Sequence, residues 1–177
     1  WSPVIGGQFW WTGLIFVLIF VPLMIFLGSK ISSKQRDMVL YGMGIYQLGN
    51  KALTQIGYIF SDNYIMASNL PLHLCGLSGI LAGIVVFYRK QILFEFLYFF
   101  GLVGFIHSVL TPEFTGGVSS WKIFDYYVGH SMLIIIPLWL MKYYEFRLRH
   151  NAWWTSFIYL QLIVVLVSQA NSIIGNG

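Results

Sequence analysis

The chain has a single cysteine, Cys75, whose thiol could act as a nucleophile. A thiol in apolar surroundings is inert unless a histidine or another positive group stabilises its thiolate. His73 is a poor partner, because two residues along a helix separate side chains by about 200°. His107 and His130 lie in other segments, and either would complete a nucleophile and base pair of the acyl-transfer kind. The structural alternative is that Cys75 is a small residue filling space among close-packed glycines.

Polar side chains within the apolar segments are concentrated at one depth. Ionisable residues in hydrocarbon are costly, so each is by default a hypothesis for a functional site. At about 1.5 Å per residue, they lie about 5–15 Å below the outer ends of their predicted helices. They are Lys51, Gln55, His73, Cys75, His107, Asp125 and His130, and only Glu95 lies clearly outside this layer. The grouping predicts a shared cavity open to the outer leaflet or outer surface.

The ring of His130 has two candidate partners on its own helix. Tyr126 precedes it by four residues and Asp125 by five, so a phenolic or acidic group could orient the imidazole. Asp125 would reach the ring only obliquely, since it lies about 140° around the helix.

Lys51 is the cation of the predicted polar layer, on one helical face with Gln47 and Gln55. One interpretation is structural, an ion pair with Asp125 or Glu95 that holds the helices together. The other is functional, because an ammonium group at this depth would bind a lipid phosphate or a carboxylate. The glutamines would then donate hydrogen bonds to an oxyanion.

A zinc site is a further alternative for the thiol and imidazole groups, with His73, Cys75, His107 and His130 as ligands. No local pair with the usual metal-ligand spacing supports it, since neither His-Glu-x-x-His nor Cys-x-x-Cys occurs. We therefore predict no metal and no cofactor.

The elements that position these residues must be membrane helices. Of the 177 residues, 58% are hydrophobic and 9% charged, with a mean hydropathy of +0.74. This composition excludes an ordinary soluble domain, a nucleotide-binding fold and a disulfide scaffold. The net charge of +4 reflects basic residues at helix ends, so it does not indicate nucleic-acid binding. The expected location is a multi-pass position in a bacterial plasma membrane.

Apolar runs of about 20 residues, the length that crosses a bilayer, predict an all-α bundle. We expect one integral membrane domain over residues 1–177, with about six helices near 9–28, 38–60, 70–88, 91–110, 122–142 and 153–172. Positive charge is concentrated in alternate connections, at Lys30, Lys34 and Arg36, at Arg89 and Lys90, and at Lys142, Arg147 and Arg149. The positive-inside rule makes these connections cytoplasmic and places both termini on the outer side.

Three motifs on successive helices carry a resemblance to a known family. They are Leu70-Pro71-Leu72-His73-Leu74-Cys75-Gly76-Leu77, Glu95 to Gly101 leading to Thr111-Pro112-Glu113, and Phe124 through Gly129-His130. Over about residues 65–140 the chain resembles the YwaF-type integral membrane proteins, whose eukaryotic branch includes transmembrane protein 164. The resemblance implies an acyltransferase acting on phospholipid, with Cys75 and His130 as its catalytic pair.

The predicted function is therefore a membrane lipid acyltransferase or transacylase with phospholipids as donor and acceptor. Lys51, Gln55, His73, His107 and Asp125 are the expected substrate-binding residues. The alternatives are a transmembrane subunit that binds a small ligand, or a structural subunit of a larger membrane complex, in which the polar groups lock helix packing.

Overall fold

The computed structural model describes residues 3, 5–60, 74–114 and 119–175, and the part it describes contains helices and no β-strand. The helices are α1 (Gln8–Lys30), α2 (Ser33–Ile59), α4 (Leu74–Phe87), α5 (Gln91–Leu110), α6 (Ser120–Tyr143) and α7 (Ala152–Gly175). The all-α prediction is confirmed. The first four residues of the predicted 70–88 segment lie outside the described residues.

Four helices are long and apolar enough to cross a membrane, judged over the described residues alone. They are α1, α5, α6 and the Ala152–Ala170 part of α7. As described, α4 has 14 residues, and α2 is 27 residues long but carries Lys51 and Gln55 of the polar layer. Whether α2 and α4 also cross the bilayer, and on which side the termini lie, stays a prediction.

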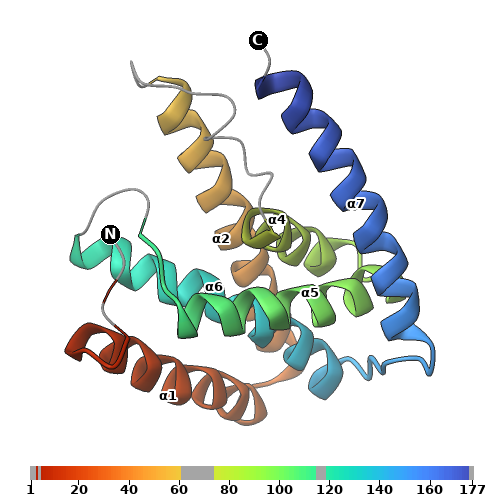
Figure 1. Cartoon of the computed structure of the whole chain (residues 1–177). Coiled ribbons are helices and arrows are strands. Elements are labelled where there is room, and N and C mark those ends of the chain that lie inside the picture. The colour runs from red at the N-terminus through yellow and green to blue at the C-terminus, as the bar shows by residue number, and fades with distance from the viewer. Residues whose placement is uncertain (1–2, 4, 61–73, 115–118, 176–177) are drawn as a thin grey trace.

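Helix α6 is at the centre of the arrangement. It contacts α1, α2, α4 and α5, and it is buried from Ser131 to Pro137 in its C-terminal half. In Figure 1, α1, α5 and α6 lie along one another, while α2 and α7 run upward across them. The main apolar core joins α2, α4, α5 and α6, and includes Leu40, Val85, Phe94 and Ile135. The C-terminal halves of α2 and α7 extend beyond this core (Figure 1).

The three basic connections meet at one end of the bundle. Arg89, between α4 and α5, lies 3.2 Å from the carboxylate of Asp37 at the start of α2. The hydroxyl of Tyr144, just after α6, donates to the same carboxylate at 2.7 Å. One acidic side chain therefore ties the three connections together. Because α4 and α6 both end here, both begin toward the opposite end, where the predicted site residues lie.

Candidate functional site

Asp125 on α6 is held by two donors from α2. The amide of Asn50 donates to its two oxygens at 3.0 and 2.9 Å, and the hydroxyl of Tyr46 donates to one of them. All three residues are half-buried. The polar layer thus brings α2 against α6, as expected, but through neutral donors that were not predicted. Their spacing of four residues, next to the Gln47 and Lys51 face, was the signal available in the sequence.

Gln47 links α6 to α4 within the same layer. Its side chain is buried, and its amide nitrogen donates to the carbonyl of Gly129 at 2.8 Å. Its amide oxygen lies 3.7 Å from where a methyl group on Gly79 of α4 would be. One glutamine side chain therefore spans the distance between these two backbones, which fixes the separation of α4 and α6 at this level.

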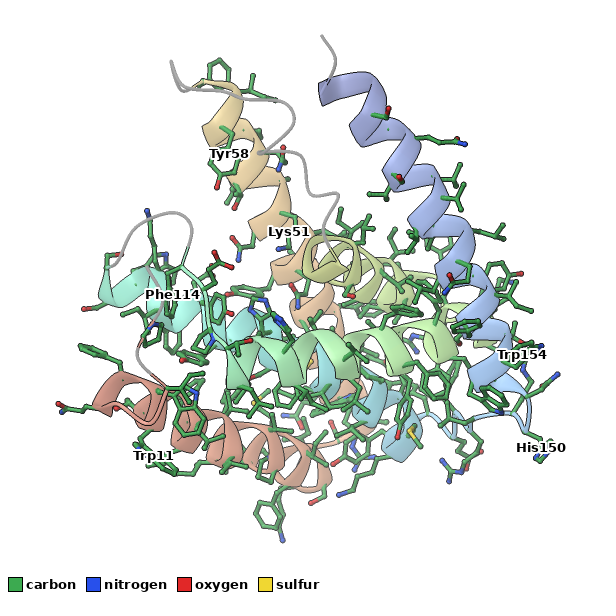
Figure 2. All side chains as sticks on the ribbon, viewed as in Figure 1. Trp11, Lys51, Tyr58, Phe114, His150 and Trp154 are labelled. Atoms are coloured by element: carbon green, nitrogen blue, oxygen red, sulfur yellow. The ribbon has the colours of Figure 1, made fainter. Side chains whose placement is uncertain are left out.

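Lys51 is packed against the same glycine, one turn farther along α2. A methyl group on Gly79 would lie 2.7 Å from its Cε and 3.6 Å from its Nζ. Figure 2 shows Lys51 beside the first turns of α4. The predicted pair with Glu95 is replaced by a pair between Glu95 and Arg149, with 2.6 Å between Oε2 and Nη2. The ammonium group is thus positioned beside α4, within the layer where we expect the lipid to react.

His130 is half-buried on α6 and contacts Tyr126 in two ways. Its Nδ1 lies 2.8 Å from the carbonyl oxygen of Tyr126, and the two ring centroids are 4.2 Å apart. A carbonyl oxygen only accepts, so Nδ1 must carry the proton in this contact. In the neutral ring Nε2 then has the lone pair, which is the form that a general base needs.

Cys75 is the second residue of α4, and its side chain lies outside the described residues, as does the whole of His73. Position 75 precedes Gly79 by four residues, so the two share one face of the helix. That face meets Gln47 and Lys51 at Gly79. The backbone therefore places position 75 one turn before Gly79 on α4, on the face that meets Gln47 and Lys51.

The two remaining predicted residues lie at the margins of the cluster. Gln55 is half-buried on α2, two turns beyond Gln47. His107 is exposed in the last turn of α5, and its carbonyl accepts from both the backbone and the hydroxyl of Thr111. The structure thus gathers Lys51, Asp125 and His130 around Gln47 and leaves His107 on the outer surface of α5.

Among the described side chains, no group of three or more histidine, cysteine, aspartate or glutamate residues is arranged to hold a metal ion. The zinc alternative also required His73 and the side chain of Cys75, which lie outside this part of the chain.

Comparison with known proteins gives one match. The model of the TMEM164 family matches residues 5–176. No curated protein and no solved structure matches the chain. YwaF-type is a related name for the same family, so the resemblance seen in the three motifs is confirmed. With nearly its whole length matched and four helices suited to crossing a bilayer, this chain belongs to the TMEM164 family of membrane proteins.

Proposed function

We propose that this chain is a membrane phospholipid acyltransferase or transacylase, with Cys75 as nucleophile and His130 as general base. The observation that supports it best is the contact of His130 Nδ1 with the Tyr126 carbonyl, 2.8 Å, which leaves Nε2 as the basic nitrogen. The resemblance in the three motifs names the same two residues. A donor phospholipid supplies the acyl chain and a lysophospholipid accepts it, so the reaction requires no cofactor.

The second support is the common level of the two residues. Gln47 joins Gly129, the neighbour of His130, to the face of α4 that carries position 75. Both α4 and α6 begin at the end opposite the basic connections. These contacts support one layer that contains both position 75, one turn before Gly79 on α4, and His130, whose ring contacts Tyr126.

The proposed reaction has two transfers. His130 Nε2 takes the thiol proton, and the sulfur of Cys75 attacks the carbonyl carbon of a donor ester. The carbon–sulfur bond forms, the ester carbon–oxygen bond breaks, and the proton passes to the leaving oxygen to release a lysophospholipid. The hydroxyl of an acceptor lysophospholipid then gives its proton to His130 and attacks the thioester. The carbon–sulfur bond breaks, and the sulfur recovers the proton.

The positive charge of Lys51 is suited to the negative groups of this reaction. Lys51 is the cation packed over Gly79 on the face of α4 that includes position 75. There it can neutralise a lipid phosphate or the negative charge that develops on the ester oxygen. We assign Gln55, His73, His107 and Asp125 to the headgroup region, and we place this layer on the outer side of a bacterial plasma membrane.

The test is mass spectrometry of the purified full chain after incubation with phosphatidylcholine or phosphatidylglycerol vesicles. We expect an acyl group on Cys75 that hydroxylamine removes. The adduct should be absent in Cys75→Ser and in His130→Ala, and present in His107→Ala, which is the alternative base. His150→Ala is the matched control, because His150 lies in the connection at the opposite end of the bundle (Figure 2).

A folded protein that forms no adduct with either lipid would overturn the proposal. Co-purification of a stoichiometric small ligand, with Cys75→Ala tolerated, would then favour a ligand-binding subunit. Loss of thermal stability without chemistry in Lys51→Leu would favour a structural subunit of a larger complex. An adduct that persists in His130→Ala and disappears in His107→Ala would transfer the role of base to His107.

A further inference from the structure

Tyr126 lies between His130 and the connection that joins α5 to α6. Its hydroxyl donates to the carbonyl of Ser108 at 3.2 Å and accepts from the backbone N–H of Glu113 at 3.4 Å. Both partners are backbone groups, at the end of α5 and in the residues that follow it. The position of the phenol hydroxyl therefore depends on the path of the chain between α5 and α6.

The ring of Tyr126 also packs against an aromatic side chain, that of Phe114. Phe114 is 5% exposed, and its ring centroid lies 4.7 Å from that of Tyr126. Figure 2 shows Phe114 beside the first turns of α6. The phenol ring thus has the aromatic ring of Phe114 and the imidazole of His130 as neighbours, and its hydroxyl is held by the backbone.

Tyr126 contacts His130 through both its backbone and its ring. Its carbonyl oxygen binds Nδ1, and its ring packs against the imidazole at 4.2 Å. The ring contact limits rotation about the side-chain bonds of His130, and the carbonyl favours the Nδ1-protonated tautomer.

We propose that Tyr126 is the positioning residue of His130. The hydrogen bonds of its hydroxyl couple the orientation of the imidazole to the path of residues 108–114. This inference rests on the proposed function of His130 for its catalytic consequence, although the tautomer itself is measurable without any reaction. Tyr126 acts on the base and does not bind lipid. Its loss should therefore lower the acylation rate at saturating lipid and leave the half-saturating lipid concentration unchanged.

The first experiment observes the ring directly. The chain has four histidines, so ¹⁵N-histidine labelling of the full chain in nanodiscs gives a spectrum that single variants such as His130→Ala can assign. We expect His130 in the wild type as the Nδ1-protonated tautomer at alkaline pH. In Tyr126→Leu the carbonyl remains but the ring is lost, so we expect a mixture of both tautomers. Tyr126→Phe should retain most of the Nδ1-protonated form.

Tyr127 provides the matched control. It is the next tyrosine on α6 but faces α1, where a methyl group on Gly13 would overlap its phenol ring. Tyr127→Phe should leave both the tautomer of His130 and the acylation rate unchanged.

The second experiment is the rate of adduct formation on Cys75. We expect a fall of about 100-fold in Tyr126→Leu, the size of effect that misplacing a catalytic group produces. Tyr126→Phe should lose about tenfold or less, because only hydrogen bonds of the hydroxyl are removed. Size-exclusion chromatography and thermal unfolding establish that each variant is folded.

The outcomes separate the two proposals. A Nδ1-protonated His130 that is unchanged in folded Tyr126→Leu overturns the positioning role, whatever the activity. A tautomer that responds to Tyr126 in a chain that never forms an adduct preserves the positioning role and contradicts the acyltransferase. A rise in half-saturating lipid concentration at an unchanged maximal rate would make Tyr126 a lipid-binding residue and overturn the inference.

Discussion

Glu95 and Arg149 form a bidentate ion pair that attaches the connection before α7 to α5. Nη2 of Arg149 lies 2.6 Å from Oε2, and Nε lies 2.9 and 3.1 Å from the two oxygens. The backbone N–H of Arg149 also donates to Oε1 at 3.0 Å. Glu95 is buried and Arg149 is half exposed. Since α7 packs on the other helices mainly through α5, this pair is a principal anchor of α7.

Arg149→Met should therefore destabilise the chain, because it leaves a buried carboxylate without its cation. The exposure of Arg149 makes this loss smaller than that of a fully buried ion pair. We expect Tm in detergent to fall by about 5–10 °C. Glu95→Gln, which retains a hydrogen-bonding group, should cost less.

Lys34→Ala is the control for removing a cation, since Lys34 is exposed at the start of α2. Its Tm should match that of the wild type. Equal effects of Lys34→Ala and Arg149→Met would show that net charge, not the ion pair, determines the stability.

If the contacts of Asp125 to α2 are its main role, its loss should lower the stability of the packing between α2 and α6. Asp125→Ala leaves the donors of Tyr46 and Asn50 without their acceptor, which costs about 1–3 kcal/mol. In a double-mutant cycle, Asn50→Ala should add little to Asp125→Ala. Thermal unfolding measures this coupling. A raised half-saturating lipid concentration with unchanged Tm would instead support the predicted role of Asp125 in substrate binding.

The helices were predictable from the sequence where their limits coincide with changes in hydropathy. Residues 91–110 match α5, because Lys90 and the Thr111-Pro112 pair bound its apolar run. Helix α2 begins five residues before the predicted 38. Ser32 and Gln35 form a capping box there, amid charged residues that a hydropathy criterion assigns to a loop.

The depth of the polar layer in a membrane follows from the rise per residue and stays a prediction. The partners within the layer were not predictable, because they depend on how each helix is rotated. Tyr126, whose carbonyl and ring contact His130, was among the candidates, whereas Asn50 as a partner of Asp125 was not. Rotation is set by close contacts between helices, which a single sequence does not display.

We expect the folded chain to lose stability at alkaline pH because of Tyr144. It lies just beyond α6, where burial and then its hydrogen bond to Asp37 raise its pKa from 10.0 to about 12. A raised folded-state pKa stabilises the fold below the unfolded value, and this contribution is lost as pH rises from 10 to 12. Tyr144→Phe should lower Tm at pH 8 and flatten its dependence on pH between 10 and 12. An equally steep fall in the variant would contradict a role for this phenol.

At Gly101 the backbone of α5 lies close to the backbone of α6, because a methyl group there would be 2.5 Å from the backbone oxygen of Leu133. A backbone oxygen in a helix cannot move aside as a flexible side chain can, so Gly101→Ala must push α5 away from α6. We expect a cost of about 2–3 kcal/mol, despite the higher helix propensity of alanine. Because α5 carries Ser108, the shift should also disturb Tyr126 and lower the Nδ1-protonated fraction of His130.

Gly49→Ala on α2 is the matched control, since a methyl group there has nothing within 4 Å, and its Tm should be unchanged or higher. A Gly101→Ala chain as stable as Gly49→Ala would mean that α5 and α6 are not packed backbone to backbone at this point, and the proposed coupling between α5 and His130 would lose its support.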